Sequence, residues 1–191
     1  MDVEKESDMV DRRHFLKLAG VGVVAFARPA GTIAQSPLKI GSVGAGRMGS
    51  ALGGLFVKAG HPVMFSSRHP ENLKDLVQRL GPLAQAGTVE QAIAFGDVVV
   101  MVVPYTALEE IGRAHGPALA AKPPVLDICN PIARRDGAGA VNRVEEQGGA
   151  GLASAKLLPG SRIVRAFNAI SYLRVASIAH RPGGFVGVPI A

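Results

Sequence analysis

A glycine-rich stretch near residue 45 is the part of this sequence with the clearest chemical potential. It fits the pattern GxGxxG, between a short apolar run at residues 38–43 and apolar residues at helical spacing over residues 50–59. In a strand–turn–helix context, the three glycines permit a tight turn, a close approach of the backbone to a diphosphate, and close helix–strand packing. The free amides at the start of such a helix favour negative charge. The pattern therefore predicts a dinucleotide-binding turn made of Gly44, Ala45, Gly46, Arg47, Met48 and Gly49.

The residues after the next predicted strand, 61–65, indicate which dinucleotide to expect. That strand runs into Ser66, Ser67 and Arg68, and residues 50–70 contain no Asp or Glu. In NAD-binding relatives an acidic side chain here accepts hydrogen bonds from the ribose 2′-hydroxyl. A 2′-phosphate needs hydroxyl donors and a cation instead, and Arg offers bidentate geometry. We therefore expect NADP(H) in preference to NAD(H); an ordinary surface Arg ahead of a helix at 71–80 is the alternative.

Further apolar runs predict the remainder of a parallel sheet. The fold class expected is α/β, a Rossmann-type doubly wound parallel sheet in a single domain. A capping box at Thr88 and Gln91 opens one short helix. Residues 133–151, rich in Gly and charge, are predicted to form a mobile loop. The other predicted strands are 97–103, 125–129 and 162–168, and the other predicted helices are 107–121, 154–158 and 171–180.

Residues at the carboxyl ends of these strands are the candidates for the nicotinamide and its redox partner, because ligands of open parallel sheets lie there. Two asparagines among them have side chains that can hydrogen-bond a carboxamide or an acceptor carbonyl, or can simply cap strand-to-helix turns. Both interpretations stay open. The candidates are Val103, Pro104, Tyr105, Asn130, Pro131, Asn168, Ala169 and Ile170.

Other reactive residue types give no comparable pattern. No convincing acid–base pair is present, so no catalytic acid, base or nucleophile is expected. The single cysteine, Cys129, lies in an apolar strand and is expected to pack rather than react. The five histidines show no ligand spacing, so no metal is expected.

Residues 1–35 are predicted to be an export signal and linker, ahead of an NADP-binding domain at 36–191. Arg12 and Arg13, followed by His14-Phe15-Leu16-Lys17, resemble a twin-arginine signal, although Asp11 departs from it. The apolar stretch after it is about ten residues, too short for a stable membrane span. Cleavage is expected after Ala27 or Ala34. The twin-arginine export machinery would then be a partner and the location periplasmic or extracellular; a cytoplasmic location is the alternative.

The net charge and the composition indicate which other classes of binding partner to expect. The chain carries a formal net charge of +6 and is 48% hydrophobic, which is enough to bury a core. It has no run of five basic residues and no aromatic–basic interleaving, so nucleic acid is not expected. The basic surface suits a phosphorylated cofactor and an anionic small-molecule acceptor. The oligomeric state stays open, with a homodimer as one option.

From residue 38 onward the chain resembles the NADPH-dependent reductases of the deazaflavin coenzyme F(420). The stretches that carry this resemblance are Gly44–Gly49, Gly60–Val63, Ser67–Glu71, Val103–Tyr105, Asn130–Ile132, Leu158–Ser161 and Arg165–Asn168.

The resemblance implies a distribution of roles. Residues 44–49 would hold the diphosphate, Ser67 and Arg68 the 2′-phosphate, and the loops at Pro104 and Asn130 would flank the nicotinamide. Hydride would pass directly between stacked rings, without a general acid. Two departures are the export signal and the end of the chain in a predicted strand at 184–191, where relatives continue, so a C-terminal truncation is expected. The alternatives are an NADPH-dependent flavin, quinone or ferric reductase, and a non-catalytic NADP-binding or redox-sensing module.

Overall fold

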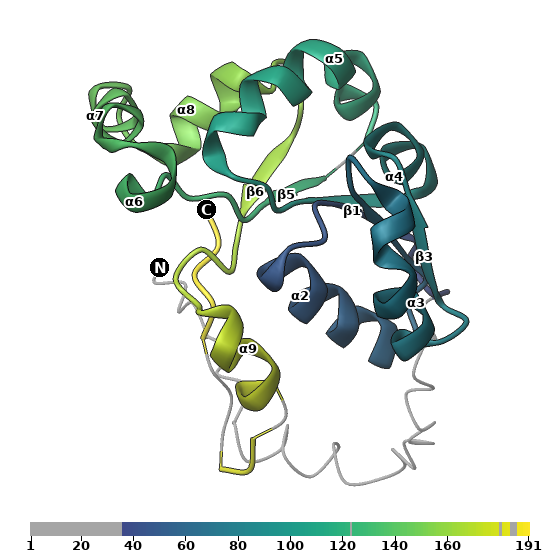
Figure 1. The fold of residues 1–191 in the computed structure, drawn as a ribbon. Coiled ribbons are helices and arrows are strands. Elements are labelled where there is room, and N and C mark those ends of the chain that lie inside the picture. Colours follow the sequence, from purple (N-terminus) through teal and green to yellow (C-terminus); the bar gives the residue numbers. More distant parts are fainter. Residues whose placement is uncertain (1–35, 123, 180, 184–186) are drawn as a thin grey trace, which may run out of the picture. The chain divides into compact units, whose positions relative to one another are not determined.

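The strands of the computed structural model lie side by side in one parallel sheet (Figure 1). The structure describes residues 36–122, 124–179, 181–183 and 187–191; the predicted export signal lies outside them. The strand order is β3-β2-β1-β4-β5-β6, and every neighbouring pair is parallel. This is the order of a doubly wound dinucleotide-binding sheet, with its switch point between β1 and β4. The predicted Rossmann-type fold is confirmed. The strands are β1 (Ile40–Val43), β2 (Val63–Ser66), β3 (Ala84–Gly87), β4 (Val98–Met101), β5 (Val125–Asp127) and β6 (Ile163–Arg165).

Helices cover both faces of this sheet and give it two apolar cores. One core contains Met101, Leu108 and Leu158, and the other contains Leu52, Phe65 and Val175. Figure 1 shows α5 and α8 on one side of the sheet and α2 and α9 on the other. The helices are α2 (Arg47–Lys58), α3 (Lys74–Leu80), α4 (Val89–Phe95), α5 (Leu108–Ala120), α6 (Ala133–Asp136), α7 (Ala138–Glu146), α8 (Ala150–Leu157) and α9 (Tyr172–Ile178), with 3-10 turns η1 (Pro70–Leu73) and η2 (Tyr105–Ala107).

Local sequence accounts for several of these elements. In β4 the residues Val99, Val100 and Met101 are all buried, because helices cover the strand on both faces. The predicted capping box is present at the start of α4: the Thr88 hydroxyl accepts from the backbone N–H of Gln91, and the Gln91 side chain accepts from that of Thr88. These signals are local, and the corresponding elements lie close to where the sequence predicts them.

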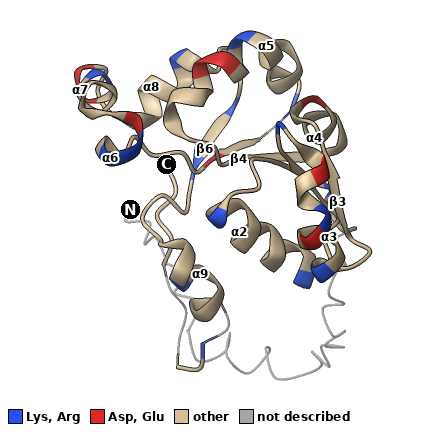
Figure 2. Ribbon diagram, in the orientation of Figure 1, with Lys and Arg blue, Asp and Glu red and all other residues tan. Residues whose placement is uncertain are grey.

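Charge in the strands is confined to one place. The charged residues in the six strands are Asp127 at the end of β5 and Arg165 at the end of β6, and they pair with each other. Figure 2 shows the other basic and acidic residues mainly on the helices. Within the described ranges, no helix combines the length and apolar character needed to cross a membrane.

Three parts of the chain differ from the sequence expectation. The loop predicted at 133–151 is wrong: α6, α7 and the start of α8 lie there, because Ala140 and Val144 repeat at helical spacing and are buried. Strand β3, with the sequence Ala-Gln-Ala-Gly, was not expected. For the strand predicted at 184–191, residues 184–186 lie outside the described part. Beyond them Ile190 forms an isolated antiparallel bridge with Ala166.

Candidate functional site

The turn between β1 and α2 is shaped by its glycines. Gly44 has φ +111°, and a Cβ there would lie 2.5 Å from the carbonyl oxygen of Val102. A Cβ at Gly49 would collide with the carbonyl oxygen of Gly44, so Gly49 lets α2 pack closely on the turn. Gly46 is different, because a Cβ there would meet no atom within 4 Å. The surrounding backbone thus leaves no room for a side chain at Gly44 or Gly49, whereas Gly46 faces open space.

Two serine hydroxyls hold the Gly44 residue in place. The hydroxyl of Ser42 donates to the Gly44 carbonyl at 2.9 Å, and the Gly44 N–H donates to the hydroxyl of Ser66 at 3.2 Å. Both serines are buried, with 2% and 1% of their surface exposed. The sequence named Ser66 as a residue that could assist Ser67 and Arg68 at a 2′-phosphate; in the structure its hydroxyl accepts the Gly44 N–H of the turn. We refer to Ser42, Gly44 and Ser66 as the serine clamp.

Arg68 follows two residues after Ser66, at the carboxyl end of β2 beside the turn. It is exposed, and it forms no hydrogen bond or ion pair with the residues that the structure describes. The Ser67 hydroxyl accepts from the backbone N–H of His69 at 3.1 Å, and the His69 side chain contacts Glu71 at 3.2 Å. Ser67 and Arg68 therefore present a hydroxyl and an uncommitted guanidinium next to the glycine turn.

A pocket of about 510 Å³ opens at the carboxyl ends of β1, β4, β5 and β6. This volume is in the range of small-molecule and cofactor sites. The structure brings together there eight residues that the sequence singled out: Gly46, Arg47, Met48, Val103, Pro104, Asn130, Asn168 and Ile170. Gly44, Ala45, Gly49, Ser66, Ser67, Arg68 and Pro131 do not line it.

Other lining residues were missed by sequence reasoning. Most are apolar and lie at the strand ends or in the segment before α9, and Arg135 comes from the region predicted to be a loop. One sequence signal for them is position, since most lie within a few residues of a strand end named above. Ile132 and Phe167 also belong to stretches that carry the family resemblance. The missed residues are Val102, Ile128, Ile132, Arg135, Phe167, Ser171 and Tyr172.

Tyr105 does not line this pocket, although the sequence suggested it beside the nicotinamide. Its side chain is 4% exposed, and its hydroxyl lies 3.3 Å from both the Ala150 carbonyl and the Ser154 hydroxyl of α8. Burial raises the pKa of Tyr105, against the opposing effect of the hydrogen bond with Ser154. The turn η2 directs Pro104 and Tyr105 to different sides, so Tyr105 packs in the core beneath α8.

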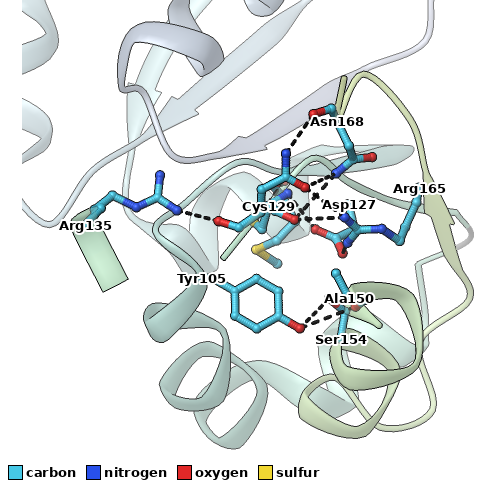
Figure 3. Close-up of polar contacts among 10 residues, drawn as sticks. Tyr105, Asp127, Cys129, Arg135, Ala150, Ser154, Arg165 and Asn168 are labelled. Atoms are coloured by element: carbon cyan, nitrogen blue, oxygen red, sulfur yellow. Dashed lines mark hydrogen bonds and ion pairs between the residues drawn. The ribbon is translucent and has the colours of Figure 1, made fainter. Parts of the chain in front are cut away.

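The loops after β5 and β6 are joined by a polar network (Figure 3). The Asp127 side chain is fully buried, pairs with the guanidinium of Arg165, and accepts from the Cys129 N–H at 2.8 Å. Arg165 also donates to the Cys129 carbonyl and to Oδ1 of Asn130, each at 3.1 Å. The buried Asp127 carboxylate thus orients the Arg165 guanidinium, and the guanidinium in turn holds the loop after β5 in place.

The two asparagines belong to the same network. The Asn130 amide donates to the Asn168 carbonyl at 2.7 Å, and the Asn168 amide donates to Oδ1 of Asn130 at 3.3 Å. These contacts favour the structural interpretation of both residues, as groups that connect two strand-to-helix loops. Both asparagines still line the pocket. The network therefore sets the position of the pocket wall that the loops after β5 and β6 form, which we call the β5–β6 wall.

Arg135 and Asp136 connect α6 to this wall. Arg135 donates to the Asn130 carbonyl at 2.7 Å and pairs with Asp136 at 2.8 Å, while Asp136 also accepts from the Ile132 N–H at 2.8 Å. Burial alone would raise the pKa of Asp136. The hydrogen bonds from Arg135 and from backbone N–H groups outweigh burial, so this pKa is lowered. The Asp136 carboxylate therefore stays charged and fixes the start of α6.

Phe167 and Cys129 lie in the loops after β6 and β5. Phe167 lines the pocket with φ +62°, a left-handed conformation that is strained for an aromatic residue. Cys129 is 2% exposed, its thiol lies 3.4 Å from the Met101 carbonyl oxygen, and burial raises its pKa well above the usual value. Its thiol is a packing group in this fold. The described residues contain no cluster of three or more His, Cys, Asp or Glu able to hold a metal ion.

The strand order, the glycine turn and the pocket at the switch point together define a Rossmann-type nucleotide-binding domain. Residues 39–131 match the family model described as NADP oxidoreductase, coenzyme F(420)-dependent. The match includes the whole glycine turn, Ser67, Arg68 and Asn130. No curated protein matches the chain.

Solved structures share the fold. A proposed F(420)-dependent NADP-reductase from Arthrobacter sp. FB24 is 21% identical with a TM-score of 0.67, over 81% of this chain and 73% of that one. A hypothetical protein from Sinorhizobium meliloti is 24% identical with a TM-score of 0.57, over 78% and 70%. Glycerol-3-phosphate dehydrogenase from Coxiella burnetii is 18% identical with a TM-score of 0.54, over 74% and 44%. At these identities the likeness establishes the fold alone.

Proposed function

We propose that this protein is an oxidoreductase that binds NADP(H) and transfers hydride between NADPH and a small redox acceptor. The observation that carries the proposal is the pocket at the β1–β4 switch point, which runs from the open Gly46 turn to the loops after β4, β5 and β6. The family match over residues 39–131 supports it. The deazaflavin coenzyme F(420) is the acceptor that this match favours; a flavin, a quinone or a ferric chelate is the alternative.

The residues present fit an NADP(H) molecule. Gly46 leaves open space where a diphosphate would approach the amides at the start of α2. Ser67 and Arg68 would hold the 2′-phosphate, because Arg68 is exposed and uncommitted and no acidic side chain replaces it at the end of β2. Ala45, Arg47 and Met48 complete the turn around the diphosphate.

The nicotinamide end would lie in the pocket beside Val103, Pro104 and Asn130, with Pro131 next to Asn130 in the chain but outside the lining. When bound, the dinucleotide supplies the hydride. The side chains of this chain then position two rings and keep water away from them, since Ile128, Phe167 and Ile170 give the pocket much of its lining. Hydride transfer between stacked rings needs no protein acid or nucleophile.

Cofactor choice is tested at Arg68. We expect Arg68→Ala to weaken NADPH binding by about 1.5–3 kcal/mol and to leave NADH binding nearly unchanged, because only NADPH carries the 2′-phosphate. Calorimetric titration of the full chain with each dinucleotide measures both. Arg79→Ala, which removes an exposed charge from α3, is the matched control. Equal losses for the two dinucleotides with Arg68→Ala would refute the 2′-phosphate assignment.

The acceptor is tested by turnover. NADPH oxidation followed by absorbance, with F(420), FMN, a quinone or ferric citrate added in turn, identifies the acceptor class. Oxidation with F(420) supports the family assignment, and oxidation with FMN or Fe(III) supports the alternative. Tight NADPH binding without turnover with any of them would instead indicate a non-catalytic binding or redox-sensing module.

We also propose that residues 1–35 direct export through the twin-arginine pathway. The proposal rests on Arg12, Arg13 and the residues that follow them. Replacing both arginines with lysine is expected to retain the protein in the cytoplasm of a host with this pathway, as measured by cell fractionation. Equal export of the wild-type and Lys-Lys chains would refute it.

A further inference from the structure

Arg47 and Tyr172 form a contact that neither the glycine pattern nor the family match explains. Arg47 is the first residue of α2, and Tyr172 is the first residue of α9, 125 positions further along the chain. Nη1 of Arg47 donates to the Tyr172 hydroxyl at 3.0 Å, and the guanidinium carbon lies 5.5 Å from the centre of the Tyr172 ring. Both residues line the pocket.

The position of Arg47 is electrostatically unfavourable in the protein alone. The amino-terminal end of a helix carries partial positive charge, which disfavours a cation there. The first turn of α2 contains no acidic residue, and Arg47 forms no ion pair with a described residue. Beside it, Gly46 leaves open space. A cation without a counter-ion at such a place is stabilised when an anion binds there.

Tyr172 offers Arg47 two interactions that are compatible with a bound anion. The ring face attracts the guanidinium, and the hydroxyl accepts one of its N–H groups, which leaves the other donors of the fork available. The Ser171 hydroxyl accepts from the Leu173 N–H and caps α9, so the start of this helix, and with it Tyr172, is fixed locally. Helix α9 itself packs on α2.

We propose that Tyr172 is a positioning residue that holds the Arg47 guanidinium at the pocket, where Arg47 binds the diphosphate of the dinucleotide. The inference rests on the proposed function, because it requires a dinucleotide at the turn. It adds a contribution from the far end of the chain, through α9, to a diphosphate site otherwise made of backbone amides. Arg47 then serves the diphosphate while Arg68 serves the 2′-phosphate.

The two roles are separated by titrating the full chain with NADPH and with adenosine 2′-monophosphate, which has the 2′-phosphate but no diphosphate. We expect Arg47→Ala to weaken NADPH about tenfold and to leave adenosine 2′-monophosphate unchanged. Arg68→Ala is expected to weaken both ligands. Arg174→Ala, which removes an exposed charge from α9 outside the pocket lining, is expected to change neither.

Variants at Tyr172 test the positioning role. Tyr172→Leu, which removes the ring and the hydroxyl, is expected to weaken NADPH nearly as much as Arg47→Ala. Tyr172→Phe keeps the ring and is expected to retain part of the affinity, with a loss of about threefold. The Arg47→Ala, Tyr172→Leu double variant is expected to bind NADPH no more weakly than Arg47→Ala alone, because Tyr172 acts through Arg47. Thermal unfolding of each variant reports its folding.

The outcomes distinguish this inference from the proposed function. If the wild-type chain does not bind NADPH, the proposed function fails, and this inference with it. If the wild-type binds NADPH but Tyr172→Leu leaves its affinity unchanged or tightens it, only the positioning role is refuted. Additive losses in the double variant, or an equal loss for adenosine 2′-monophosphate with Arg47→Ala, would also overturn it.

Discussion

The turn after β1 and the loops after β5 and β6 line the same pocket, but different forces hold them in place. The turn depends on glycine backbone and on the serine clamp, whose groups are uncharged. The β5–β6 loops depend on a buried ion pair, Asp127 with Arg165, and on two asparagine amides. At the glycine turn, stability and dinucleotide binding should depend on side-chain size, because a side chain there would fill space that the backbone or the ligand needs. At the β5–β6 wall, stability should depend on whether the buried Asp127 carboxylate keeps its partner, Arg165.

The largest effect is expected where the β5–β6 wall loses its cation. Arg165→Met leaves the fully buried Asp127 carboxylate without its partner, so the free energy of unfolding should fall by about 3–5 kcal/mol. Urea unfolding measures this. The Arg165→Met, Asp127→Leu double variant removes both charges and should lose less than the single variant. Arg113→Ala breaks a surface ion pair with Glu109 and should change stability little. A similar small change with Arg165→Met would refute the difference between the walls.

The turn is expected to respond to size, and differently at two of its glycines. Gly44→Ala places a Cβ against the Val102 carbonyl at φ +111° and should lower the free energy of unfolding by about 1–3 kcal/mol. Gly46→Ala meets no atom within 4 Å and should leave stability nearly unchanged while weakening NADPH binding. Urea unfolding and NADPH titration of both variants check this. Comparable destabilisation by the two substitutions would contradict the assignment.

The smallest effect is expected at Asp136, which links α6 to the β5–β6 wall. Asp136→Asn keeps a hydrogen bond to Ile132 but loses the ion pair with Arg135, so stability at pH 7 should fall by about 1 kcal/mol. Because folding lowers this pKa, the carboxylate's contribution is complete above the ordinary value of 3.8. It is lost as the pH falls through the folded pKa. The difference between wild type and variant should therefore disappear in acid, as measured by unfolding across pH 2–7. A constant difference would refute the ionic role.

The same contrast explains what could be predicted from the sequence. The turn, the capping box at Thr88 and the apolar strands rest on neighbouring residues, and they were predicted close to their observed positions. The network was not, because Asp127 and Arg165 are 38 residues apart and only the sheet brings them together. Strand β3 has little strand propensity of its own and forms at the edge by pairing with β2. The side of the sheet taken by Tyr105 depends on the turn η2, which no local pattern indicated.

The serine clamp has a consequence for how a dinucleotide would meet the turn. Both sides of the Gly44 residue are already hydrogen-bonded to buried hydroxyls before any ligand arrives. The loss of backbone freedom in this segment therefore occurs during folding, and little of it is left to oppose association. A turn organised before binding in this way favours fast association with a dinucleotide at a small entropic penalty.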